Sequence, residues 1–281
     1  MPHLLSVWPS VARRIRDAGT ALLLFDFDGT LVPIVDRPEL AVLAPETRQR
    51  LANLAERENF ITGIISGRSL PDVSTKVDAP GLVYVGNHGL EMAGCGISFS
   101  HPQARQVRET LARVCDKLGE ALSVLPGTII EDKGLTLSVH YRLVSESEQA
   151  TVRQRFDDVL LPYTKSGQLR TTAGKMVLEV RPNVDWGKGK AITELQRMFP
   201  DAGLKLRTSP HTSVPVGRRV EGPPLTLFFG DDVTDEDGFA AVQETDGVAV
   251  FVGAARQPTS ALHRVDSPAE VSHALELLEQ L

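Results

Sequence analysis

The sequence predicts an α/β protein in which an α+β module interrupts a parallel sheet. Near both ends of the chain, short apolar runs that stop at polar or glycine-containing turns alternate with segments of helical spacing, which is typical of a parallel sheet covered by helices. In the middle, paired alternating stretches joined by tight turns replace this rhythm, which favours antiparallel hairpins. We therefore expect a core over 1–102 and 186–281 and an inserted α+β domain over 103–185.

The N-terminal part of the core alternates helices and strands. Apolar residues at i, i+3, i+4, i+7 and i+11 predict an amphipathic helix over 4–18, and similar spacing predicts a second helix over 45–58. Three short apolar runs, each ending at a polar or glycine turn, predict buried strands. These strands are expected at 21–27, 60–65 and 82–85.

The inserted region predicts helices and β-hairpins, and the core pattern resumes after it. The helices are expected at 107–122 and 145–161, and the hairpins at 128–141 and 169–180 with turns at Lys133-Gly134 and Ala173-Gly174. The remaining core elements are expected to be a helix at 188–198, a loop rich in proline and glycine at 207–224, strands at 225–229 and 247–252, and a final helix at 271–281.

Composition excludes several classes of protein. The longest apolar runs have five residues, too few for a membrane span, and Arg13, Arg14 and Arg16 interrupt the place where a signal peptide needs an apolar segment, so we expect a cytoplasmic protein. The net charge of −6 argues against a nucleic acid or an anionic membrane as partner. Two cysteines indicate neither a disulfide framework nor a zinc site. We expect a monomer that acts on a small molecule.

The most informative segment is the string Phe25-Asp26-Phe27-Asp28-Gly29-Thr30-Leu31. Carboxylates at i and i+2 on a strand point to the same side, while Phe27 points away. They stand at the carboxyl end of a strand, where α/β sheets bind ligands. Paired carboxylates repel each other unless a metal or a shared proton compensates. One of them suits a nucleophile and the other an acid and base.

This string resembles the first motif of haloacid-dehalogenase-type phosphatases, and three further motifs recur in order. Ser66, at the end of a strand, matches the second motif, and Lys188, at the start of a helix, matches the third. The fourth is the acidic loop 230–237, Gly-Asp-Asp-Val-Thr-Asp-Glu-Asp. The resemblance implies a Rossmann-like parallel-sheet core with an inserted α+β cap domain.

The resemblance also implies roles for these residues. Asp26 is expected to be the nucleophile and Asp28 the acid and base, with Ser66 and Lys188 on the phosphoryl oxygens. Mg²⁺ prefers oxygen ligands, and phosphoryl transfer needs its charge neutralised. We expect Mg²⁺ on Asp26, on Asp231 and on the backbone carbonyl of Asp28.

The other acids of the loop are open to two interpretations. Asp232 and Asp235 are expected to lie behind the metal or to reach it through water. Glu236 and Asp237 are interpreted as acids at the start of a helix, where the helix dipole favours them.

Further strings narrow the resemblance to the trehalose-6-phosphate phosphatase family over about residues 20–253. They are Gly86-Asn87-His88-Gly89-Leu90-Glu91, Gly134-Leu135, Ser138-Val139-His140-Tyr141-Arg142 and Lys175-Met176-Val177-Leu178-Glu179-Val180-Arg181-Pro182. In that family the cap contacts the sugar. The substrate-binding residues implied here are Arg68, Asn87, Glu131, Lys133, Arg142, Lys175 and Glu179. His140 is interpreted as structural, and the role of His88 stays open.

The resemblance implies a stand-alone, Mg²⁺-dependent phosphatase that hydrolyses trehalose 6-phosphate through an aspartyl-phosphate, without a glycosyltransferase domain. One alternative is a phosphatase of another sugar phosphate, such as sucrose 6-phosphate, because the core motifs do not separate the two. A second is a catalytically silent sugar-phosphate-binding module. Asp26, Asp28, Lys188 and Asp231 argue against it, since a sensor needs no acid and base.

Overall fold

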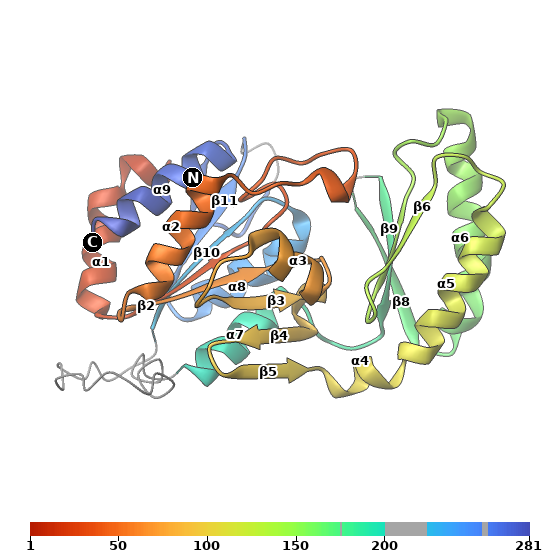
Figure 1. Ribbon diagram of the computed structural model, residues 1–281, viewed down its shortest axis with the longest axis horizontal. Helices are drawn as coiled ribbons and strands as arrows, with labels where there is room; N and C mark the ends of the chain where they lie inside the picture. Colours follow the sequence, from red (N-terminus) through yellow and green to blue (C-terminus); the bar gives the residue numbers. More distant parts are fainter. Residues whose placement is uncertain (175, 200–223, 255–257) are drawn as a thin grey trace. The chain divides into compact units, whose positions relative to one another are not determined.

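The computed structural model describes residues 1–174, 176–199, 224–254 and 258–281. Its strands form two separate sheets (Figure 1), and the chain divides into two units. The first unit consists of Met1–Phe99 and Trp186–Leu281, and the second of Ser100–Asp185. Among the described residues, no helix is both long and apolar enough to cross a membrane.

The first unit is built on an eight-stranded sheet in the order β12-β11-β10-β1-β2-β3-β4-β5. The strands from β12 to β3 are parallel, and β4 returns antiparallel to β3. Their bounds are β1 Ala21–Phe25, β2 Phe60–Ile65, β3 Val83–Gly86, β4 Glu91–Gly94, β5 Ile97–Ser100, β10 Leu225–Gly230, β11 Val248–Val252 and β12 His263–Val265. Thus β1 is central, between β10 and β2.

Helices cover both faces of this sheet. Leu23 and Phe25 of β1 pack with α1 (Trp8–Ala18), α2 (Pro45–Glu56), α3 (Leu70–Val77) and α9 (Pro268–Glu279), whereas Leu22 and Leu24 pack with α7 (Lys188–Met198) and α8 (Glu236–Glu244). Because both faces are buried, β1 reads as a continuous apolar run rather than an alternating one.

The second unit is a four-stranded antiparallel sheet with helices on one face. Its order is β6-β7-β9-β8, with β6 Ile129–Asp132, β7 Leu137–His140, β8 Leu169–Gly174 and β9 Val177–Pro182. The helices are α4 Pro102–Gln106, α5 Arg108–Leu122 and α6 Glu146–Lys165. Leu137, Val139 and Val180 pack against α5 and α6. Alternation along the strands therefore leaves the opposite face of the sheet to polar residues.

Most predicted elements are present, and the differences have local causes. The strand 60–65 and the helix 188–198 have the predicted bounds. The helix predicted from residue 4 begins at Trp8, because Pro9 starts it after a separate 3-10 turn. The strand predicted to reach Phe27 ends at Phe25, since the carbonyl of Phe27 accepts hydrogen bonds from the turn that follows.

Other predictions were wrong or incomplete. The hairpin turn predicted at Ala173-Gly174 is not there, because β8 continues through both residues and Gly174 pairs with Val177. The short strands β4, β5 and β12 were missed, since runs of three or four residues carry little pattern. The predicted loop at 207–224 lies, except for Pro224, outside the described residues.

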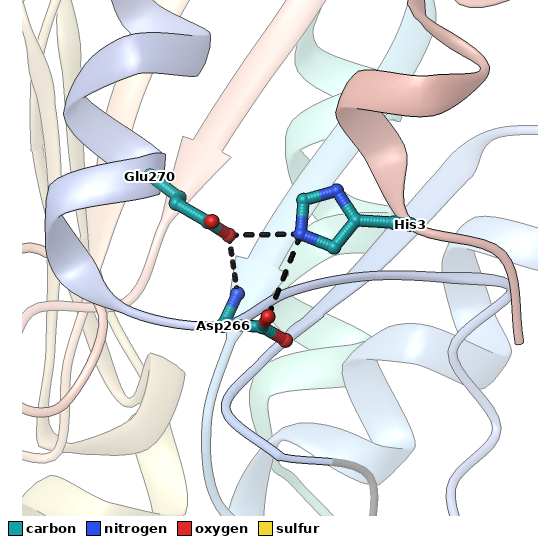
Figure 2. A group of neighbouring side chains, drawn as sticks. All are labelled: His3, Asp266 and Glu270. Carbon is teal, nitrogen blue, oxygen red and sulfur yellow. Dashed lines mark hydrogen bonds and ion pairs between the residues drawn. The ribbon is translucent and has the colours of Figure 1, made fainter.

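A cluster of three side chains fastens the N-terminal segment to β12 and α9 (Figure 2). Nε2 of His3 lies 2.9 Å from a carboxylate oxygen of Glu270 and 3.8 Å from one of Asp266, and the Asp266 N–H donates to Glu270 at 2.6 Å. Arg264, which pairs with Asp266, donates its N–H to the carbonyl of Pro2 at 3.1 Å. The segment before α1 is therefore an integral part of the first unit.

Candidate active site

The sheet order brings motifs that are far apart in sequence to one edge. Asp26 directly follows β1, Ser66 follows β2 and Asp231 follows β10, and these three parallel strands are neighbours. The Asp26 N–H donates to the carbonyl of Phe229 at 2.9 Å, which extends the pairing of β1 and β10 to the site itself. Carboxyl ends of parallel strands are where α/β sheets bind ligands, so this edge is the candidate active site.

A buried lysine joins two carboxylates at this edge. Nζ of Lys188, at the first residue of α7, donates to Oδ1 of Asp26 at 2.7 Å and to Oδ1 of Asp235 at 2.5 Å. The side chain of Lys188 is 3% exposed and that of Asp235 is fully buried. Ion pairs removed from water in this way are strong and costly to break.

The charges of this group shift two pKa values. Burial raises the pKa of the Asp26 carboxyl well above its usual range; Lys188 opposes this effect, and the nearby charges of Asp235 and Asp231 reinforce it. Burial lowers the pKa of the Lys188 ammonium, but the two carboxylates raise it by more, so the net shift is upward and the lysine stays charged. One ammonium thus pairs with two carboxylates, with that of Asp231 close to them, which leaves excess negative charge for a cation to neutralise.

The carboxylates fit a divalent cation. Ligand oxygens of Asp26, Asp231 and Asp235 lie within 4.8 Å of one another. Oxygen ligands of this kind suit Mg²⁺. The turn after Asp28 leaves no space for a side chain: Gly29 has φ +87°, and a Cβ there would stand 2.2 Å from Oδ2 of Asp231. Glycine at this position therefore lets the acidic loop approach the turn that follows Asp28.

Asp235 also organises the acidic loop. Its Oδ2 accepts the N–H groups of Asp231 and Asp232, both at 3.0 Å, while its Oδ1 faces Lys188. The side chain of Asp232 instead caps the 3-10 turn Val233–Asp235 by accepting the N–H of Val233 at 2.8 Å. Of the two residues left open by sequence, Asp235 therefore belongs to the carboxylate group and Asp232 to the cap of the turn.

Asp28 has partners different from those of Asp26. Both of its carboxylate oxygens accept from the guanidinium of Arg68 at 2.7 Å, and Arg68 also contacts Asp72 at 2.7 Å. Burial lowers the pKa of Arg68, but the hydrogen bonds and charges of Asp28 and Asp72 raise it by more, for a net upward shift. The buried Arg68 is thus held by two carboxylates that are themselves partly exposed.

The loop that contains Ser66 is supported from behind by a strained turn. Oγ of Ser66 accepts the N–H of Arg68 at 3.1 Å, and the N–H groups of Asn87 and His88 donate to the carbonyls of Arg68 and Ser66 at 2.7 and 2.9 Å. Asn87 and His88 have φ values of 50° and 55°. A Cβ on Gly67 would stand 2.4 Å from Cε1 of His88, so the buried ring packs directly on the loop.

The side chain of Asn87 contacts β4, while its backbone supports the Ser66 loop. Its Nδ2 donates to Glu91 at 2.8 Å on β4. Asn87 and His88 are both buried.

Three predicted sugar contacts lie together in the second unit. The pairing of β6, β7, β9 and β8 aligns Glu131, Ser138, Glu179 and Thr172 in one row. Nζ of Lys133 lies 3.8 Å from Glu131 and 3.9 Å from Glu179.

Neighbours complete this polar face. Nε2 of His140 lies 3.1 Å from Glu131, and Arg181 donates to Glu179 at 2.5 Å. The side chain of Arg142 is exposed, and Lys175 lies outside the described residues. The structure therefore groups Glu131, Lys133 and Glu179.

The sequence analysis did not predict three residues as ion-pair partners of the site residues. They are Asp235, which pairs with Lys188, Asp72, which pairs with Arg68, and Arg181, which pairs with Glu179. The sequence held a usable signal for two of them. Asp72 stands at i+4 from Arg68, a spacing typical of ion pairs on a helix. Asp235 has the spacing of a capping box with Asp232. Arg181 had none, because a same-face i+2 pair is common in strands.

The arrangement of β1 between β2 and β10, with an aspartate at its carboxyl end, defines the class: the first unit is a haloacid-dehalogenase-type core. The chain belongs to the trehalose-phosphatase family, whose model matches residues 24–269.

Individual relatives agree with this assignment. The chain is 34% identical over 265 residues to the trehalose-phosphate phosphatase of Mycobacterium leprae, covering 91% of this chain and 57% of the relative. It is 33% identical to the probable trehalose-phosphate phosphatase 2 of Oryza sativa subsp. japonica, covering 99% and 72%. The solved C-terminal domain of C. albicans trehalose-6-phosphate phosphatase matches with a TM-score of 0.77 and 25% identity, covering 100% and 98%. This chain therefore spans little more than half the length of the mycobacterial relative.

Substitution of Asp235 and of Asp232, whose roles the sequence left open, should change the free energy of unfolding by very different amounts. Asp235→Asn should lower the free energy of unfolding by about 3–5 kcal/mol, because it leaves the buried Lys188 with one fewer charged partner. Asp232→Asn should change it by only a few tenths of a kcal/mol, since asparagine caps about as well as aspartate. Urea denaturation followed by circular dichroism measures both, and similar small losses would contradict the structural role of Asp235.

Proposed function

We propose that this protein is a Mg²⁺-dependent phosphatase that hydrolyses trehalose 6-phosphate to trehalose and phosphate through an aspartyl-phosphate. The observation that carries the proposal is the buried pair of Asp26 and Lys188 within a group of carboxylates at the carboxyl end of β1. The names of the relatives support the substrate, and the sugar's many hydroxyls suit a polar binding face.

The proposed reaction has two steps, both centred on Asp26. A carboxylate oxygen of Asp26 attacks phosphorus in line, the bond to the sugar oxygen breaks, and Asp28 gives that oxygen its proton. Asp28 then takes a proton from water, whose oxygen attacks the aspartyl-phosphate, releasing phosphate and restoring Asp26. Lys188 and Ser66 would bind the phosphoryl oxygens meanwhile.

Asp26 and Asp231 would hold the cation, with Asp235 in the same group of carboxylates and the backbone carbonyl of Asp28 as the ligand that the family resemblance implies. When bound, Mg²⁺ would neutralise charge on the phosphoryl oxygens. Lys188 would hold the carboxylates of Asp26 and Asp235 in place both with and without bound phosphate, because it pairs with them independently of the phosphate.

The second unit would act as the cap that reads the sugar. Glu131 and Glu179 offer acceptors and Lys133 offers donors, a mixture that suits a disaccharide. Arg142, Lys175 and Asn87 remain further candidates from the family resemblance. Closure of a cap would exclude bulk water from the site and add binding energy from the distal sugar.

A phosphate-release assay over a panel of sugar phosphates tests the proposal as a whole. Preference for trehalose 6-phosphate supports it. Preference for another ester, such as sucrose 6-phosphate, would keep the chemistry and replace the substrate. Binding of sugar phosphates without release of phosphate would indicate a binding module instead.

The nucleophile is tested by Asp26→Asn. Turnover should fall at least a thousandfold, because the amide cannot attack phosphorus and the volume hardly changes. The far-ultraviolet circular dichroism should match that of the wild type. A variant that keeps a tenth of the activity, in a preparation checked for deamidation by mass spectrometry, would remove Asp26 from this role.

The metal is tested by chelation. Dialysis against EDTA should abolish phosphate release, and added Mg²⁺ should restore it. Mg²⁺ should also raise the melting temperature of the chelated protein, since a ligand that binds only the folded state stabilises it. Asp231→Asn should weaken both responses. Full activity after exhaustive chelation would argue against a metal.

The sugar contacts are tested by Glu131→Ala, Lys133→Ala and Glu179→Ala. Each should lower kcat/KM for trehalose 6-phosphate about 10- to 100-fold, the worth of a charge-assisted hydrogen bond of ~1.5–3 kcal/mol. Each should leave p-nitrophenyl phosphate nearly unaffected, because that ester lacks the sugar. Equal losses on both esters would mean damage to the fold, and no loss on either would make these residues ordinary surface charges.

A further inference from the structure

Arg68 directs its guanidinium into the protein rather than toward a ligand. Nε and Nη2 donate to the two carboxylate oxygens of Asp28, Nη1 donates to Asp72, and Nη2 also donates to the carbonyl of Pro38 at 2.9 Å. Four of the five N–H donors of the guanidinium are thereby used. The side chain of Arg68 is 7% exposed and that of Asp28 is 39% exposed. The carboxylate is therefore the group of this pair that a substrate can reach.

The arginine is itself fixed from two sides. Its guanidinium carbon lies 5.4 Å from the centre of the Phe27 ring, which is fully buried between the two motif aspartates. Its backbone N–H donates to Oγ of Ser66, and its carbonyl accepts the N–H of Asn87. Arg68 thus connects the loop expected to bind phosphate to the carboxylate of Asp28.

We infer that Arg68 is a positioning residue for Asp28 and does not bind the substrate directly. A planar guanidinium that grips both oxygens holds the carboxylate plane in one orientation, which a lysine cannot do. An ionised carboxylate has about four lone-pair sites, so two remain open for proton exchange with the sugar oxygen and with water. This inference rests on the proposed function, because it has meaning only where Asp28 is the acid and base.

The first test compares two esters with Arg68→Lys. For trehalose 6-phosphate, kcat/KM should fall about 10- to 100-fold, a part of the 10²–10⁴-fold that general acid–base catalysis contributes. For p-nitrophenyl phosphate it should fall less than about threefold, because nitrophenolate departs without a proton. Arg50→Lys is the matched control: Arg50 contacts Glu279 and Glu276 on α9, away from the site, and should retain wild-type values.

A double-mutant cycle separates positioning from direct binding. If Arg68 acts through Asp28, the variant Asp28→Asn with Arg68→Lys should be no slower than Asp28→Asn alone, within about threefold, because coupled residues are not additive. If the two losses multiply, Arg68 contacts the substrate independently and the inference is overturned. Equal losses on both esters for Arg68→Lys would overturn it as well.

A second, milder substitution tests the inference in case Arg68→Lys misfolds. Asp72→Asn keeps the arginine but loosens one of its contacts, so it should give the same selective loss on trehalose 6-phosphate with a smaller magnitude. No selective loss, in a variant that melts as the wild type does, counts against the inference. Failure of the proposed function is recognised separately, since the wild-type protein would then not release phosphate from trehalose 6-phosphate, whereas the inference about Arg68 fails in an enzyme that is active on this substrate.

Discussion

The ammonium of Lys188 between Asp26 and Asp235 is the contact on which the first unit depends. It ties the end of β1, the start of α7 and the loop after β10 to one another, across 162 residues of sequence to Asp26 and 47 to Asp235. Removing either carboxylate leaves a buried charge partly uncompensated, at a cost of about 3–5 kcal/mol. The same charges that organise the fold here are those that the proposed chemistry uses, so stability and reactivity are coupled at this point.

The apolar surroundings strengthen this electrostatic arrangement. The rings of Phe25 and Phe229, on β1 and β10 directly before Asp26 and Gly230, stack with centroids 5.0 Å apart. Phe27 is likewise buried beneath the guanidinium of Arg68. An apolar floor of this kind keeps water away from the charges, and interactions between charges are stronger where water is excluded.

The sequence alone was sufficient to predict the helices and strands that have strong apolar patterns, and the site residues at the ends of those elements. The strand at 60–65 and the helix at 188–198 were predicted with their exact bounds, because continuous apolar runs and helical spacing extend through them. Asp26, Ser66, Lys188 and Asp231 were placed at one edge by the order of the motifs. Glu131, Lys133 and Glu179 were predicted as a set, and the structure does group them.

Pairing between distant residues was harder to predict. Which acid of the loop 230–237 faces Lys188 depends on how the loop closes, and only the structure selects Asp235. The partnership of Arg68 with Asp28 depends on the depth of the arginine in the core, which spacing does not encode. The second hairpin turn was misplaced because a glycine marks where a chain is able to bend, while strand pairing decides where it does.

The turn at Asn87 and His88 has a consequence for selection on stability. Two successive non-glycine residues with positive φ cost of order 1–3 kcal/mol each, whereas glycine adopts this conformation freely. A screen that rewards only thermal resistance would therefore tend to enrich glycine at these positions. The same exchange would remove the ring that packs on Gly67 and so loosen the Ser66 loop. The strained turn thus keeps the Ser66 loop rigid. Directed evolution for thermal stability alone would make this loop less rigid.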